Sequence, residues 1–417
     1  MKRKMKIVRL SFLLFLLLQA ISSQSCSKQD RLALSALTSR FQIPFSSDSD
    51  CCEWEGVKCN SSTGRVTELS LRNSVEQYIN YSDFSVFKDL KHLHLSLDNN
   101  IVGCVGNEGL PSLEVLELKL DNAASILSCV DGLSNLKSLY LSYNSFNTSS
   151  LHHVLETLSS KLSNLEVLDI SGNTLTNDIL PSLEGFTSLK ELHLSQTELD
   201  SDLHIEGLCS KLSNLEVLDL SQNNFKDCDI GSALRLSILT NLTNLALSYN
   251  NIHNFVVREG SKSLSRLEEL TLDGNMIDGN KLRDSLRALS SSIRVLSMSG
   301  NTFKGTIVAG DFKDLSNLQN LRLDGSRNME NKFLKRIGEL TSLKLLSVAY
   351  SDINGTLPQA DWFKLKNLEE LDLSYNKFDG PLPSSFGNMT SLRILELSQN
   401  LFTGQFDSNI ASLTSPS

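Results

Sequence analysis

The side chains best suited to chemistry in this 417-residue chain are its eight cysteines and seven histidines. Four of the cysteines, Cys26, Cys51, Cys52 and Cys59, lie near the amino terminus. Thiolates at this spacing could bind zinc or form disulfides, and four cysteines allow three disulfide connectivities. Because two of them are adjacent, no histidine lies near them and a secretory leader precedes them, we favour disulfides over zinc.

Catalytic motifs are missing from the sequence. It contains no Walker loop, G-x-S-x-G elbow, H-E-x-x-H, Cys-x-x-Cys or kinase signature. The histidines are His92, His94, His152, His153, His193, His204 and His253. They are interpreted as scattered residues without a carboxylate set at metal-ligand spacing, and His152-His153 as the solvated face of a helix. We therefore expect no enzyme activity, no metal site and no cofactor.

The first 23 residues have the three parts of a secretory signal. A basic leader precedes an apolar segment from Leu10 to Leu18, and small residues follow. A signal anchor is the alternative, but this segment is shorter than the ~20 apolar residues of a membrane span. Cleavage would remove five positive charges, changing the net charge from −9 to −9 − 5 = −14. Such acidity argues against nucleic acid or anionic lipid as a partner.

The rest of the chain also fits a secreted protein. No long apolar run follows the leader, so we expect no membrane span in this chain. Six N-x-S/T sequons predict glycosylation, at Asn60, Asn80, Asn147, Asn241, Asn354 and Asn388. We expect passage through the secretory pathway to an extracellular or plasma-membrane-associated location.

One leucine pattern repeats along most of the chain. The motif L-x-x-L-x-L-x-x-N recurs fourteen times at intervals of 23 to 29 residues. The units begin at Val66, Leu90, Leu113, Leu136, Leu165, Leu189, Leu215, Leu242, Leu267, Ile293, Leu318, Leu343, Leu368 and Leu392. Alternation predicts a short strand in each unit, with leucines inward and the intervening residues outward. Asparagine at the ninth position is predicted to bond the backbone of neighbouring turns; six units have Ser, Asp or Thr instead.

This pattern resembles the leucine-rich repeat family. The segments 354–358 (NGTLP) and 378–383 (FDGPLP) are similar to the extension found in plant extracellular members. The resemblance implies an α/β, right-handed leucine-rich repeat solenoid: a curved superhelix with a parallel concave sheet and a partial second sheet. Gly305 and Gly404 keep the glycine of this extension without its proline, so we expect the second sheet to be patchy.

The amino-terminal segment resembles the plant leucine-rich repeat cap, with its paired cysteines, tryptophan and Gly-Val (51–59, CCEWEGVKC). That resemblance implies the disulfides Cys26–Cys51 and Cys52–Cys59. The expected organisation is a signal peptide at 1–23, a disulfide cap at 24–65, about fourteen repeats at 66–415 and the start of a broken-off repeat at 416–417.

The remaining four cysteines lie in the repeats. Cys104 and Cys129 fall 14 and 16 residues into consecutive units, so stacking would bring them close on the convex side. A disulfide there is one hypothesis. Cys209 is interpreted as a buried thiol, and a Cys209–Cys228 bridge is the alternative.

The outward strand residues predict a continuous concave face suited to long ligands. At the fifth position of each unit, Asp and Ser are interpreted as residues that only solvate the sheet. Aromatic residues and arginine are enriched at binding hot spots. The candidate ligand-binding residues are Tyr140, Tyr143, His193, Thr271 and Arg322. A longer convex helix is expected in the unit from 136, and the aromatic stretch 72–89 is expected to pack on the cap.

Three functions remain open. The favoured one is the ligand-recognition region of a plant cell-surface receptor-like protein, carboxy-terminally truncated, that binds a peptide, glycan or protein and acts with a co-receptor kinase. The alternative is a secreted inhibitor of wall-degrading enzymes, similar to polygalacturonase inhibitors. The third is a nonfunctional fragment. The truncation is inferred from Pro416, which stands where the next unit's first leucine is expected.

Overall fold

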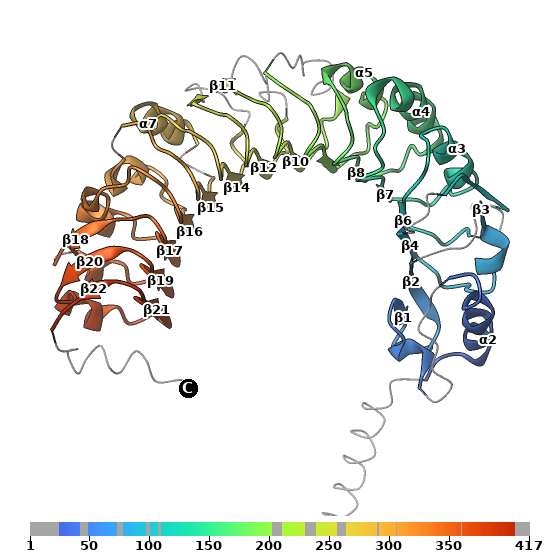
Figure 1. Cartoon of the computed structure of the whole chain (residues 1–417), viewed down its shortest axis with the longest axis horizontal. Helices are drawn as coiled ribbons and strands as arrows, with labels where there is room; N and C mark the ends of the chain where they lie inside the picture. The colour runs from blue at the N-terminus through green and yellow to red at the C-terminus, as the bar shows by residue number, and fades with distance from the viewer. Residues whose placement is uncertain are drawn as a thin grey trace, which may run out of the picture. The chain divides into compact units, whose positions relative to one another are not determined.

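The computed structural model describes residues 25–41, 49–72, 78–96, 101–106, 110–201, 211–229, 239–256, 264–289, 292–305, 307–359 and 361–404. The chain divides into two compact units, Met1–Leu168 and Asp169–Ser417. The predicted leader, Cys209, His204 and the end of the chain from 405 lie outside the described residues. Each unit is built from stacked repeats (Figure 1).

In the first unit, strands β2 (Val66–Arg72), β4 (His92–Ser96), β6 (Val115–Leu118) and β7 (Ser138–Tyr140) pair in parallel. The register places Leu69, Leu93, Leu116 and Leu139 side by side, and all four are fully buried. This inward leucine row is the core that the alternation predicts. The next strand, β8 (Val167–Asp169), lies at the end of this unit in the sequence.

The second unit continues the same plan in nine strands. They are β9 (Glu191–His193), β10 (Val217–Asp219), β12 (Asn244–Ala246), β14 (Glu269–Thr271), β15 (Val295–Ser297), β16 (Asn320–Arg322), β17 (Leu345–Ser347), β19 (Glu370–Asp372) and β21 (Ile394–Glu396). Each pairs in parallel with the next. Every one of these strands begins two residues after a predicted unit start, so the leucine-rich repeat fold is confirmed.

The ninth-position side chains tie neighbouring turns together as predicted. Asn250 Nδ2 donates to the carbonyls of Leu220 (3.1 Å) and Leu247 (3.0 Å), and its Oδ1 accepts from the Phe225 amide (3.2 Å). Serine makes a smaller version of this bridge: Ser351 Oγ donates to the Leu323 carbonyl at 3.1 Å. The asparagine amide satisfies more backbone groups because it has two donors and an acceptor.

Among the residues that the structure describes, the second sheet is patchy, also as predicted. Strands β18 (Asn354–Thr356), β20 (Lys377–Gly380) and β22 (Leu401–Phe402) form one piece, and β11 (Asp227–Asp229) pairs with β13 (Asn254–Val256). In the first unit β3 (Tyr78–Asn80) pairs with β5 (Gly103–Val105). At Gly380, φ is +69° and an added Cβ would lie 2.7 Å from the Thr356 methyl, so this bend requires glycine.

The amino-terminal cap covers the first repeat. It consists of helix α2 (Lys28–Leu37), the 3₁₀ turn η1 (Cys51–Glu53) and strand β1 (Val57–Cys59), which pairs antiparallel with β2. The disulfides are Cys26–Cys51 and Cys52–Cys59, as the family resemblance implies. Buried Asp30 accepts from the Val66 amide at 2.8 Å, so the helix satisfies the exposed edge of the repeat stack.

In many of the repeats, the described residues include a helical segment that follows the strand. The long helix predicted after residue 136 is α4 (Thr148–Lys161), with a capping box at Asn147. A disulfide joins Cys104 of β5 to Cys129 of α3 (Ser125–Val130), with 4.6 Å between the Cα atoms. The others are η2 (Tyr81–Phe84), η4 (Asn177–Ile179), α5 (Leu180–Leu183), α7 (Gly279–Ala288), η7 (Ala309–Phe312), η8 (Asn331–Glu339), η9 (Trp362–Lys364) and η10 (Ser384–Asn388).

The aromatic stretch before β4 packs as expected. Phe84 of η2 lies against Phe41 of the cap, with ring centroids 6.0 Å apart. Tyr81 is fully buried and donates its hydroxyl to the Cys129 carbonyl at 2.8 Å. No helix among the described residues is long and apolar enough to span a bilayer.

Candidate functional site

The outward residues of the strands form straight rows because every strand pairs in the same register. In the second unit the fifth-position row is His193, Asp219, Ala246, Thr271, Ser297, Arg322, Ser347, Asp372 and Glu396. A parallel row of third positions, including Glu191, Asn244 and Glu269, faces the same way. We call these two rows, and the equivalent rows on the strands of the first unit, the strand face.

Three predicted binding residues lie on this strand face but do not touch one another. His193 is on β9, Thr271 on β14 and Arg322 on β16. With strands about 4.8 Å apart, His193 and Thr271 are about 14 Å apart along the row. The structure therefore places these three residues at separate positions along an extended surface. Tyr140 occupies the equivalent row of the first unit, next to Glu117.

Tyr143 is placed differently from the prediction. It does not lie on the strand face with Tyr140, but in the turn after β7, at φ +56° and with 55% of its surface exposed. The same eighth position has positive φ in every unit from this one to the last. Its occupants are Tyr143, Gly172, Gln196, Gln222, Tyr249, Gly274, Gly300, Gly325, Tyr350, Tyr375 and Gln399. The four glycines are the sequence signal that could have identified this left-handed turn.

Tyrosines of this eighth-position column lie over their neighbours. The Tyr350 and Tyr375 rings stack with centroids 4.1 Å apart and planes at 11°. The Tyr249 ring lies over Gly274, where an added Cβ would approach it to 2.5 Å. The exposed aromatic surface at the edge of the strand face is therefore an ordered feature of the turns.

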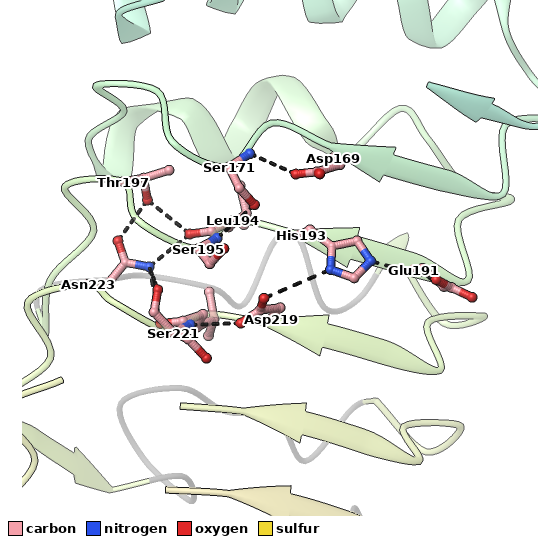
Figure 2. Close-up of polar contacts among 11 residues, drawn as sticks. Asp169, Ser171, Glu191, His193, Leu194, Ser195, Thr197, Asp219, Ser221 and Asn223 are labelled. Atoms are coloured by element: carbon pink, nitrogen blue, oxygen red, sulfur yellow. Dashed lines mark hydrogen bonds and ion pairs between the residues drawn. The ribbon is translucent and has the colours of Figure 1, made fainter. Parts of the chain in front are cut away.

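His193 is the best-defined polar group on the strand face (Figure 2). Its Nδ1 lies 4.0 Å from Asp219 Oδ2, and its Nε2 lies 3.6 Å from Glu191 Oε2. Asp219 is on the next strand in register, and Glu191 is two residues earlier on the same face. Interaction with Asp219 raises the pKa of His193 above its ordinary value of 6.5, burial opposes this, and Asp169 adds to the rise. The acidic surroundings thus favour an imidazolium.

Asp219 has two functions in this arrangement. Burial alone would raise its pKa, but His193 and the Ser221 amide outweigh burial and lower it. The Ser221 amide donates to Asp219 Oδ1 at 2.9 Å. Asp169 and Asp372 likewise accept a hydrogen bond from the backbone amide of the second residue after them, Ser171 and Ser374 respectively. The expectation that these aspartates only solvate the sheet is therefore wrong, because each closes the turn at the end of its strand.

The expectation that the histidines have no carboxylates at ligand spacing is also wrong. His92 and His94 lie on one face of β4, and His92 Nδ1 is 3.4 Å from Glu68 Oε2 on β2. Burial would raise the pKa of Glu68, but Lys58 and the two histidines lower it below its ordinary value. His152 and His153 lie on α4, and their Nδ1 atoms are 3.8 and 3.5 Å from carboxylate oxygens of Glu156. These two histidines fit the prediction of a solvated helix face.

The backbone plan defines the class of this protein as a leucine-rich repeat solenoid. Two models described as leucine rich repeat match residues 341–402 and residues 135–158, 164–186 and 214–235. An internalin from Listeria monocytogenes has a TM-score of 0.54 at 23% identity, covering 76% of this chain and 82% of the internalin chain. A TDR receptor structure has a TM-score of 0.52 at 25% identity, covering 70% of this chain and 48% of that chain.

The sequence relatives are more specific. Cuscuta receptor 1 from Solanum lycopersicum is 32% identical over 390 residues, covering 82% of this chain. Receptor-like protein 39 from Arabidopsis thaliana is 29% identical over 388 residues, covering 88% of this chain. The chain is thus similar in sequence to plant receptor-like proteins. It spans 32% of the length of the first relative and 42% of the second.

Proposed function

We propose that the chain is the extracellular ligand-recognition region of a plant cell-surface receptor-like protein, without catalytic activity of its own. The observation that carries this proposal is the strand face, which aligns outward side chains of successive repeats in register within each unit. Separate contact points along an open face suit an extended peptide, a glycan or a protein surface. A signal would then pass through a partner kinase.

The contact residues we propose are Tyr140, His193, Thr271 and Arg322 on the strand rows, with Tyr143 at the edge. Arg322 is exposed, whereas His193 and Thr271 are partly buried. Arg322 offers a planar cation, His193 an imidazole among acidic side chains, and Tyr140 an amphipathic ring. This mixture favours a ligand that carries both a carboxylate or hydroxyl groups and an apolar side.

The secreted location rests on the leader and the sequons. Asn60, Asn147, Asn354 and Asn388 are exposed, whereas Asn80 and Asn241 are partly buried. Asn147 caps α4 through Oδ1, which accepts from the Ser150 amide at 2.8 Å, so a glycan on Nδ2 leaves the cap intact. We propose glycosylation at all six, with lower occupancy at the two partly buried sites.

The proposal is tested with the purified secreted chain on an array of short peptides and plant and fungal wall oligosaccharides. Binding should weaken by about 2 kcal/mol in Arg322→Ala or Tyr140→Ala if either is a hot spot. His153→Ala is the matched control, because this side chain is 85% exposed on α4. Binding that is equally sensitive to His153→Ala, or inhibition of a fungal polygalacturonase, would refute the proposal and favour the inhibitor.

A further inference from the structure

A second histidine group lies on the first unit, on strands that the proposed ligand contacts do not use. His92 and His94 are alternate residues of β4, so both side chains leave the same face of the sheet. Their ring centroids are 6.5 Å apart, with ring planes at 85°. Glu68 of β2 is paired directly with His92 and lies on that face. Two imidazoles and a carboxylate thus converge from two adjacent strands.

The donor atoms of these three residues are close enough to share an ion. One ligand atom from each of Glu68, His92 and His94 lies within 4.8 Å of the others. Tetrahedral zinc with bonds near 2.0–2.1 Å requires donor atoms about 3.4 Å apart, so modest side-chain rotations suffice. The strands themselves need not move, because Leu69, Leu93 and Leu95 beneath them are fully buried.

We propose that Glu68, His92 and His94 form a binding site for a divalent transition-metal ion of the Zn²⁺ type. Imidazole nitrogens suit Zn²⁺ and its first-row neighbours, whereas Ca²⁺ and Mg²⁺ prefer an all-oxygen set. Three protein ligands on an open face leave a fourth position for water or for a donor group of a bound partner. The ion would also place a positive charge on an acidic chain.

Two neighbouring residues adjust this site. Glu117 of β6 is paired with His94, and His94 Nδ1 lies 2.8 Å from Glu117 Oε2. When Nδ1 donates this bond, the lone pair is on Nε2, the atom that then binds metal; carboxylates orient metal-binding histidines in this way. Lys58 Nζ contacts the other Glu68 oxygen at 2.8 Å. Lys58 competes with the ion for the carboxylate, and its 71% exposed side chain can leave.

The test is a calorimetric titration of the metal-stripped, secreted chain with Zn²⁺. We expect one equivalent to bind in the wild type, with Ca²⁺ or Mg²⁺ in excess having no effect. His92→Ala should abolish this binding, and Glu117→Gln should weaken it about 10-fold. His152→Ala is the matched control, because that histidine also lies near a carboxylate, Glu156, at 3.8 Å.

A gain-of-affinity variant protects the test against a folding artefact. Lys58→Gln removes the competing cation, so it should bind Zn²⁺ several-fold more tightly than the wild type while melting at a similar temperature. The proposal fails if the wild type binds no Zn²⁺, if binding persists in His92→Ala with His94→Ala, or if His152→Ala abolishes it. It also fails if Lys58→Gln leaves the affinity unchanged.

Discussion

The two units contain the same cross-strand pair in different surroundings. In each, a fifth-position histidine faces a carboxylate in register on the next strand: His94 faces Glu117, and His193 faces Asp219. Two residues before the histidine, the first unit has His92 and the second has Glu191. His92 completes a donor set with His94 and with Glu68 on the preceding strand, whereas Glu191 adds a second carboxylate beside His193. The repeat supplies the geometry, and the third-position residues determine the chemistry.

The largest expected effect comes from exchanging that residue between the units. His92→Glu leaves one imidazole among carboxylates in the first unit, so Zn²⁺ binding should be lost. Glu191→His gives the second unit two imidazoles beside Asp219, which lies 4.0 Å from His193, so a second equivalent of Zn²⁺ should bind. Calorimetry on both variants measures the exchange. Glu191→Gln is the control, and a gain of binding there would contradict the comparison.

The next effect tests whether the strand face of the first unit depends on the Cys104–Cys129 disulfide. Cys104 and Cys129 join β5 to α3, away from the histidines, and close a segment with a sequence separation of 25. Replacing both by serine should cost about 3 kcal/mol of unfolding free energy, because the unfolded chain gains freedom. Chemical denaturation measures this loss. Zn²⁺ affinity at Glu68, His92 and His94 should not change; a parallel loss would mean that the face depends on the disulfide.

The sequence predicted the fold well because leucine burial determines it. Alternating leucines positioned the strands, and the 29-residue interval after 136 marked α4. The disulfide pairing of the amino-terminal cap was predicted from the family resemblance, since four cysteines alone allow three connectivities. The candidate site was less predictable. Tyr143 was assigned to the strand face as if it stood two positions after Tyr140. It stands three positions after Tyr140, in the turn that follows β7, where φ is positive.

The metal donor set was missed for a similar reason. The predicted face was built from fifth positions, whereas Glu68 and His92 stand at third positions of adjacent units. Their proximity depends on which residues pair across the two strands, and residues 24 apart in sequence show no local pattern. His94 and Glu117 are likewise brought together only by strand pairing.

A smaller effect concerns the pH dependence of the second unit. The pKa of His193 is raised in the folded state, so its stabilisation is complete below the unfolded value of 6.5 and is lost as pH rises through the folded value. The Asp219 pKa is lowered, so its contribution holds above its unfolded value of 3.8. His193→Gln should therefore be most destabilising between about pH 4 and 6.5, by at most about 1 kcal/mol because the side chain is partly exposed. Urea unfolding of the wild type and of His193→Gln at pH 5.5 and 8.5 measures the loss of unfolding free energy. This loss should be smaller at pH 8.5.

The smallest effect tests which carboxylate holds the imidazolium. Asp219→Asn removes a negative charge but keeps an oxygen that can accept from the Ser221 amide, so the turn should remain. The pKa of His193 should fall, as followed by an NMR titration of its ring protons. Asp169→Asn is the matched control: Asp169 closes an equivalent turn, and its charge contributes less to the pKa of His193 than the Asp219 contact does. If the pKa of His193 fell further in Asp169→Asn than in Asp219→Asn, the surrounding acidic residues, and not the cross-strand pair with Asp219, would be what raises that pKa. The parallel between His193–Asp219 and His94–Glu117 would then be one of position only.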